Sequence, residues 1–145
     1  QPGGPSSGIL PATLNDVPLD FDTLQPHGSF IGSAAVVVMS DQDKARDAAL
    51  NMLRFFEDES CGQCTPCREG TGWLYRMLTR IVEGKGTMQD LDKLDDVASK
   101  IEGRTICAFG EAAAWPTQSF VTKFRKDFLA KAKSQKRKKD SMQLI

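Results

Sequence analysis

The spacing of hydrophobic and polar residues changes near residue 40 and separates two regions of the chain. Beyond this point apolar residues recur at intervals of three and four, which is the period of an amphipathic α-helix. Short connections between four such segments favour a compact antiparallel four-helix bundle. The stripes expected to face its core are Ala45, Ala48, Ala49, Met52, Phe55 and Phe56; Trp73, Leu74, Met77, Leu78, Ile81 and Val82; Leu91, Leu94, Ala98 and Ile101; and Phe120, Val121, Phe124 and Phe128.

Capping signals predict where these helices begin and end. In a capping box, a hydroxyl and a carboxylate three residues apart satisfy free backbone amides, and two pairs fit it: Ser40 with Asp43, and Thr87 with Asp90. Thr65 is the expected N-cap of the second helix, because Pro66 suits a first position where the missing amide costs nothing. The expected ends of the first three helices are Glu57, Gly84 and Gly103, and the fourth helix is expected from Pro116 to Lys131.

Residues 1–40 lack the helical period and are rich in turn-forming residues. Ser33–Met39 is the best strand candidate, since it is β-branched and bounded by Gly32 and Ser40. Ile9–Leu14 and Val17–Phe21 are shorter strand-like or loop segments. One strong strand does not close a sheet, so we expect this region to complete a small unit whose other strands lie upstream. The predicted fold class is therefore α+β.

Charge is balanced overall but unevenly distributed. Among 145 residues, 19 Lys and Arg offset 19 Asp and Glu, so no general field for binding polyanions is expected. The segment from Lys131 to Lys139 is strongly basic, and a solvated, flexible tail is the favoured interpretation over nucleic-acid binding, because no aromatic residue is interleaved. No apolar run is long enough for a membrane span, and no secretory leader is visible.

The chain's four cysteines form a three-plus-one arrangement. Cys61, Cys64 and Cys67 are spaced as two successive Cys-x-x-Cys steps, and Cys107 lies far downstream in the connection before the fourth helix. Iron–sulfur cubanes are commonly held by such a group of thiolates. In an antiparallel bundle the loops after the first and third helices lie at the same end, so we expect all four cysteines to ligate one centre, with [4Fe–4S] favoured over [2Fe–2S].

Two other uses of the cysteines are open. Structural zinc usually takes two well-separated ligand pairs, and the single histidine, His27, is in the other region of the chain. Paired disulfides are typical of smaller and more cysteine-dense domains. Both arrangements fit the cysteine spacing less well than an iron–sulfur cluster does. A structural zinc-binding interaction module is kept as the alternative from another functional class.

Other conspicuous residues have simpler interpretations. His27 is expected in a solvated turn, and Gly3–Gly8 is expected to be a plain loop because it lacks the Lys-Ser/Thr and helix of a phosphate-binding loop. Trp73 and Trp115 are expected in the core beside the metal centre. Arg68 and Arg104 neighbour cysteines and either offset the charge of a cluster or lie exposed. No combination of residues for covalent catalysis is found, so no catalytic residue is predicted.

The run Glu59-Ser-Cys-Gly-Gln-Cys-Thr-Pro-Cys-Arg-Glu-Gly70 resembles the NADH-binding flavoprotein subunit of respiratory complex I (NADH:quinone oxidoreductase). It equally resembles the homologous subunits of NAD-dependent formate dehydrogenases and NAD-reducing hydrogenases. The likeness continues through Ile101-Glu-Gly-Arg-Thr-Ile-Cys-Ala-Phe-Gly-Glu-Ala-Ala-Ala-Trp-Pro116. Upstream, Gly3–Gly8 and Gly28–Met39 look like the end of that family's β-grasp domain.

The resemblance implies three domains: residues 1–40 as the C-terminal portion of a β-grasp (SLBB-like) domain, 41–131 as a four-helix [4Fe–4S]-binding domain, and 132–145 as a basic tail. It implies a relay that takes single electrons from reduced FMN and passes them to further iron–sulfur centres. FMN and NAD(H) would bind the family's flavin half, which these residues do not include. The implied partners are that half and other iron–sulfur subunits, especially a [2Fe–2S] thioredoxin-like one. The implied location is the cytoplasm, or the matrix or cytoplasmic side of a respiratory membrane.

Overall fold

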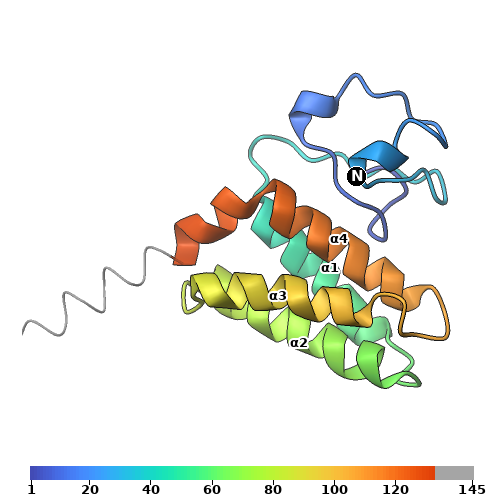
Figure 1. Cartoon of the computed structure of the whole chain (residues 1–145). Helices are drawn as coiled ribbons and strands as arrows, with labels where there is room; N and C mark the ends of the chain where they lie inside the picture. Colours follow the sequence, from blue (N-terminus) through green and yellow to red (C-terminus); the bar gives the residue numbers. More distant parts are fainter. Residues whose placement is uncertain (133–145) are drawn as a thin grey trace, which may run out of the picture.

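The structure is a computed structural model that describes residues 1–132, and four α-helices dominate it (Figure 1). They are α1 (Ala45–Glu59), α2 (Thr65–Val82), α3 (Met88–Ile101) and α4 (Phe109–Lys123). Two short 3-10 helices, η1 (Ala12–Leu14) and η2 (Gln25–His27), lie in the N-terminal region. A further helical segment at 125–132 follows α4 after a turn at Phe124.

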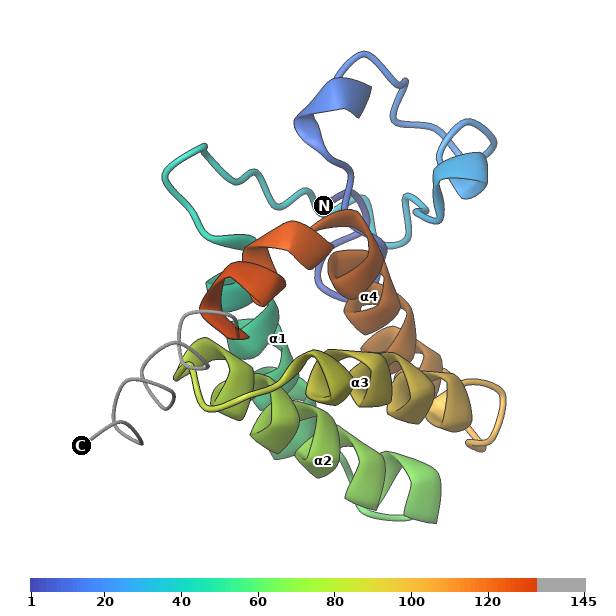
Figure 2. The same ribbon diagram turned by 60° about the vertical axis from the view of Figure 1, so that its left-hand side comes forward.

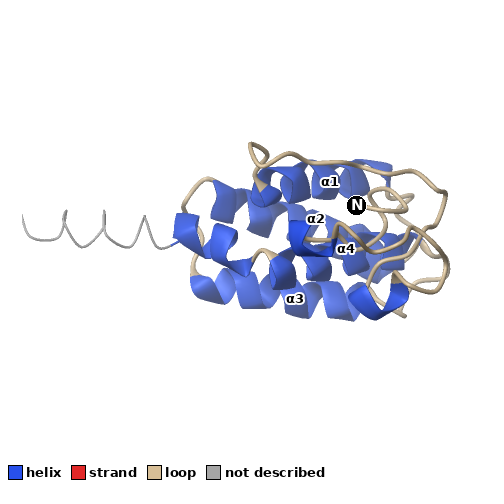
Figure 3. Ribbon diagram, turned by 90° about the horizontal axis from the view of Figure 1, so that it is seen from above, coloured by secondary structure: helices blue, strands red, loops and turns tan. Residues whose placement is uncertain are grey.

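The four helices pack as the predicted antiparallel bundle. Each helix contacts the next one along the chain, and α4 returns to contact α1, which closes the ring. Figures 2 and 3 show the helices side by side, with the N-terminal region on the α4 side. Because consecutive helices run in opposite directions, the α1–α2 and α3–α4 loops lie at the same end of the bundle (Figure 1).

Apolar side chains from all four helices fill the core. The fully buried ones include Leu53, Leu74, Leu78, Ile81, Leu91, Leu94, Ile101 and Phe120, joined by Phe128 from the segment after α4. Burying each side chain of this size contributes about 1.5–3 kcal/mol relative to leaving it exposed. The helical stripes predicted from the sequence therefore form the core, with exceptions at their edges.

Three of the predicted aromatic core residues lie at the surface instead. Phe55 is 49% exposed, Trp73 is 52% exposed and Trp115 is 40% exposed. The Trp115 indole also has a polar partner, since its Nε1–H donates to Glu102 Oε1 at 2.6 Å. The prediction that both tryptophans are core residues is therefore wrong.

The capping predictions differ in outcome between α1 and α3. Thr87 and Asp90 form the predicted capping box at the start of α3. Ser40 and Asp43 do bond, with Asp43 Oδ2 accepting from the Ser40 amide at 2.7 Å, but this turn lies ahead of α1. Helix α1 begins only at Ala45, with no side-chain cap. The hydrogen bond between Ser40 and Asp43 was predicted correctly, but it does not cap α1.

The start of α2 lies one residue earlier than predicted, and the start of α4 lies seven residues earlier. Thr65 is the first residue of α2 and Cys64 takes the N-cap position. Helix α4 begins at Phe109 and contains Pro116, the residue predicted to open it. A proline inside a helix removes one backbone hydrogen bond. The same part of α4 contains an additional side-chain hydrogen bond, which the Thr117 hydroxyl donates to Ala113 O at 2.7 Å.

The predicted strand at Ser33–Met39 does not form. Within residues 1–132 no strand is present, and the pairing in this region is one isolated antiparallel bridge between Pro2 and Val36. A strand needs a continuous row of backbone partners, and here the pairing consists of this bridge and the adjacent hydrogen bonds between Val37 and Gln1. Val36 and Val38 consequently remain 48% and 87% exposed.

The N-terminal region lies along α4 through a few contacts (Figure 1). Ile9 and Leu24 are its buried apolar residues. The predicted basic tail falls outside the described residues, apart from Ala132. Among the helices that the structure describes, none is both long and apolar enough to span a membrane.

Candidate metal centre

The cysteines occupy the end of the bundle where the α1–α2 and α3–α4 loops meet. Cys61 lies in the first loop, Cys64 immediately precedes α2 and Cys67 lies in its first turn, while Cys107 lies in the second loop. A direct contact joins the two loops, because the backbone N–H of Ile106 donates to Cys64 Sγ at 3.4 Å. The fold therefore brings the loop of the distant fourth cysteine against the loop of the first three.

All four cysteines carry free thiols, so the disulfide alternative does not hold in this structure. Cys61 and Cys107 are exposed, Cys64 is partly buried and Cys67 is buried. As placed, no group of three or more His, Cys, Asp or Glu side chains in residues 1–132 could hold a single metal ion. The thiols are gathered at one end of the bundle without being closed around one point.

Cys67 is the most enclosed of the four thiols, and its pKa is raised. Burial is the largest cause, and a hydrogen bond with Ser60 works in the opposite direction. The negative charges of Cys107, Cys61 and Cys64 raise the pKa further. The three other cysteines therefore lie close enough to Cys67 to act on its charge, and a cation bound beside Cys67 would counter this effect.

The backbone around Cys67 is held in place on two sides. The Thr71 hydroxyl donates to Cys67 O at 2.8 Å from the next turn of α2. One turn after Cys67, Gly70 lies against Ile101 of α3, where a Cβ would be 2.6 Å from Ile101 Cδ1. The absence of a side chain at Gly70 therefore lets α2 and α3 approach closely beside the cysteines.

The loop before α2 bends through Gly62, whose φ of 78° lies in the left-handed region that favours glycine. The Arg68 guanidinium, predicted either to offset cluster charge or to lie exposed, donates to Gly62 O at 3.0 Å and is half exposed. It thus fixes the loop backbone. Arg104 is exposed and donates to Ser99 O at 3.0 Å.

The first turn of α2 also provides a favourable electrostatic setting. Backbone amides at a helix start have no intrahelical acceptor, and the helix dipole places partial positive charge there. Cys67 lies in this turn and Cys64 is its N-cap residue. A set of four thiolates around iron is anionic, so the helix start stabilises it. Soft thiolate ligands with this arrangement suit iron–sulfur clusters, and the donor set therefore fits such a group.

Sequence reasoning missed the side chain of Ser60 at this site. Ser60, the last residue before the cysteine run, places its Oγ 3.3 Å from Cys67 Sγ. It precedes Cys61 directly, but its partner is seven positions away because the loop folds back on the start of α2. No sequence pattern indicated this contact.

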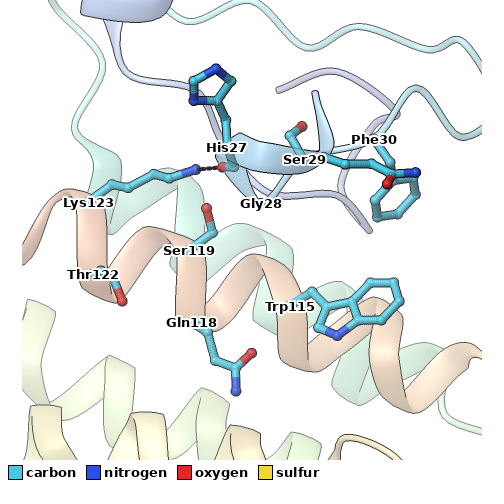
Figure 4. A pocket seen from close by; sticks show the side chains of 10 residues that line it. His27, Gly28, Ser29, Phe30, Trp115, Gln118, Ser119, Thr122 and Lys123 are labelled. Atoms are coloured by element: carbon cyan, nitrogen blue, oxygen red, sulfur yellow. Dashed lines mark hydrogen bonds between the residues drawn. The ribbon is translucent and has the colours of Figure 1, made fainter. Parts of the chain in front are cut away.

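A separate hollow of about 590 Å³ lies between α4 and the N-terminal region (Figure 4). Its walls include an edge-to-face pair, Phe30 and Trp115, with ring centroids 5.7 Å apart. At its other end Lys123 Nζ donates to His27 O at 2.6 Å, so His27 takes part through its backbone. No cysteine lines this hollow.

Comparison with known proteins shows the family of this chain. Residues 47–131 match the family model for the NADH-ubiquinone oxidoreductase-F iron-sulfur binding region. The chain is 46% identical over 133 residues to the F subunit of NADH-quinone oxidoreductase from Rickettsia rickettsii, covering 92% of this chain and 32% of that protein. It is 47% identical over 125 residues to the mitochondrial NADH dehydrogenase [ubiquinone] flavoprotein 1 of Dictyostelium discoideum, covering 86% and 26%.

A solved structure gives the same result. An NAD+-reducing NiFe-hydrogenase in its H2-reduced state aligns with a TM-score of 0.78 and 32% identity, covering 90% of this chain and 22% of that one. The chain thus spans about a third or less of the proteins it matches. It belongs to the family of the NADH-ubiquinone oxidoreductase-F iron-sulfur binding region.

Proposed function

We propose that Cys61, Cys64, Cys67 and Cys107 hold a [4Fe–4S] cluster that relays single electrons. The observation that carries this proposal is that the loops and helix start bearing all four free cysteines lie at one end of the bundle, where the hydrogen bond from Ile106 to Cys64 joins the two loops. The family match to an iron–sulfur binding region supports it independently. When bound, the cluster supplies a one-electron redox couple.

The chain's own residues would hold and shelter this centre. The α2 start provides backbone amides beside Cys64 and Cys67, and burial of Cys67 excludes water from one side. The exposed Cys61 and Cys107 leave the other side open toward a donor or acceptor. No catalytic acid, base or nucleophile is needed, because electron transfer breaks no bond in the protein.

In the larger setting, we propose an electron-transfer segment of an NADH-oxidising flavoprotein subunit of the complex I type. Reduced FMN would donate the electrons after NADH has reduced it, and further iron–sulfur centres would accept them, first in a [2Fe–2S] thioredoxin-like subunit. Residues 1–40 would complete a β-grasp domain through the Ser33–Met39 segment. Such a subunit would work in the cytoplasm, or at the matrix or cytoplasmic side of a respiratory membrane. The names of the relatives support an NADH dehydrogenase flavoprotein subunit as this setting; the [2Fe–2S] partner and the β-grasp domain rest on the sequence resemblance.

The corresponding subunit of an NAD-reducing hydrogenase is the second candidate, and the hydrogenase alignment favours it. An NAD-dependent formate dehydrogenase subunit, proposed from the sequence resemblance, belongs to the same class. Purification of the native complex, with identification of its other subunits by mass spectrometry, separates the three systems.

Anaerobic reconstitution with iron and sulfide tests the cluster. We expect broad charge-transfer absorbance, about four irons per chain and a paramagnetic signal after reduction by dithionite. Replacement of each cysteine by serine is expected to lower iron content, while replacement of the exposed Ser99 by alanine should leave it unchanged. A colourless protein that binds one zinc would contradict the proposal and favour the zinc module.

A further inference from the structure

Ser60 lies between the end of α1 and the cysteine run, and its hydroxyl has two partners. Its Oγ is 3.3 Å from Cys67 Sγ, and the backbone N–H of Gly62 points at the same oxygen from 3.4 Å. Ser60 is partly buried and Cys67 is only 8% exposed. The hydroxyl therefore connects the loop backbone to the most enclosed cysteine of the site.

The direction of the Ser60–Cys67 bond follows from the count of hydrogens. A free thiol could donate to the serine, but a thiolate bound to iron has no hydrogen and can only accept. The Gly62 amide occupies an acceptor position on the serine oxygen, which leaves the hydroxyl hydrogen for the sulfur. With a metal centre in place, Ser60 is thus a donor to Cys67 Sγ.

We propose that Ser60 raises the reduction potential of the cluster by donating this hydrogen bond. The inference rests on the proposed function, since it requires an iron–sulfur centre at the four cysteines. A donor to a ligand sulfur stabilises the reduced cluster more than the oxidised one, because the reduced form carries more negative charge. The Gly62–Ser60–Cys67 chain of hydrogen bonds polarises the hydroxyl and strengthens the effect.

Burial makes this hydroxyl difficult to replace. At the exposed Cys61 and Cys107, water can donate to sulfur in place of a protein group. Cys64 receives its bond from the Ile106 backbone N–H, which side-chain substitutions other than proline leave in place. Cys67 is enclosed, so loss of the Ser60 hydroxyl should leave its sulfur with one donor fewer.

Nearby Thr105 offers a matched control. Its hydroxyl also lies next to a cysteine, but it donates to the carbonyl oxygen of Cys107 at 2.9 Å and not to a sulfur. Thr105→Val removes that hydroxyl and keeps the branched shape that packs against Gly110. A general effect of losing a hydroxyl near the cluster would appear in both variants.

The test is a redox titration of the reconstituted chain and its variants, followed by the paramagnetic signal of the reduced cluster. In Ser60→Ala the potential should fall, so that at a fixed ambient potential the ratio of reduced to oxidised cluster drops by up to about tenfold, or about 59 mV for a one-electron couple. Ser60→Thr keeps a hydroxyl and should keep the parent reduction potential, and Thr105→Val should also leave that potential unchanged. The Fe–S stretching frequencies in the Raman spectrum should shift in Ser60→Ala and stay unchanged in Thr105→Val.

The results separate failure of the proposed cluster from failure of the proposed role of Ser60. If the parent chain binds no iron, the proposed function fails and the role of Ser60 fails with it. If the parent assembles a cluster and Ser60→Ala keeps full iron with an unchanged potential, only the role of Ser60 is overturned. Ser60→Gly provides a second variant without the hydroxyl. Loss of iron from both would also overturn the inference, since the hydroxyl would then serve assembly and not the potential.

Discussion

The bundle and the N-terminal region are held by different kinds of interaction. In the bundle, buried aliphatic and aromatic side chains from every helix form one continuous core. In residues 1–40 few apolar side chains are buried, and many of the contacts are hydrogen bonds of small polar groups, such as Ser29 Oγ to Gly8 O at 2.8 Å. The cysteines are thus carried by the part of the molecule in which stability is distributed over many contacts.

The difference has a consequence for cooperativity. Apolar burial is non-directional and shared among many residues, so one substitution weakens the bundle without changing its plan. The N-terminal region depends on single directional contacts, and loss of one should release it locally. The two regions are therefore expected to respond differently to substitution.

The largest effect is expected from Leu94→Ala in the centre of α3. Leu94 is fully buried, so its truncation removes apolar contacts and leaves a cavity. We expect a loss of about 2–5 kcal/mol in the free energy of unfolding, measured by chemical denaturation. Leu19→Ala is the control, because Leu19 is 51% exposed in the N-terminal region and should cost under about 0.5 kcal/mol. Equal losses in both variants would contradict the comparison.

Gly8→Ala should detach the N-terminal region and leave the bundle intact. A Cβ at Gly8 would overlap the backbone oxygen of Gly28, which cannot move aside as a side chain can. We expect faster proteolysis and amide exchange within residues 1–40, at a cost of about 1–3 kcal/mol. Helix content and exchange in α2 and α3 should be unchanged. Loss of the bundle's protection in this variant would show that the two regions unfold together.

Lys123→Met tests the polar anchor on α4. Lys123 Nζ donates to the carbonyl oxygens of Ile9 and His27, each at 2.6 Å, and burial lowers the pKa of this amine. Removal of the donor leaves two carbonyl oxygens without this partner, and we expect a loss of about 1–3 kcal/mol in local protection around Ile9 and His27. Amide exchange measures it. Lys126→Met, at an exposed position beyond α4, should not affect these amides.

The smallest effect concerns Asp43 in the turn before α1. Hydrogen bonds from the Ser40 backbone and side chain lower the pKa of Asp43 below its ordinary value of 3.8. A folded pKa below the unfolded one means that the turn's stabilisation is present above the unfolded value and is lost as pH falls through the folded one. Ser40→Ala should raise the Asp43 pKa only in part, because the backbone bond remains. An NMR titration measures this, and Asp20, whose pKa is lowered by Thr23, is the control.

Helices with local signals were predicted well. The stripe of Leu91, Leu94, Ala98 and Ile101 forms the buried face of α3, and the Thr87–Asp90 box begins it. Both features depend on residues within one or two turns of each other, so the linear pattern contains them. The start of α4 was predicted wrongly because Pro116 was also interpreted as a local signal. Its local preference marks a helix start, but packing of α4 in the bundle outweighs that preference.

The amino-acid sequence by itself determined the period of the helices and the three-plus-one grouping of cysteines, because both depend on spacing along the chain. Tertiary structure decided which edge residues such as Trp73 stay exposed, and it left Ser33–Met39 without strand pairing beyond the bridge between Pro2 and Val36. It also decided that the Ser60 hydroxyl meets Cys67 and that the Ile106 amide reaches Cys64. Such contacts depend on how loops fold back and helices approach, and no short-range pattern encodes that geometry.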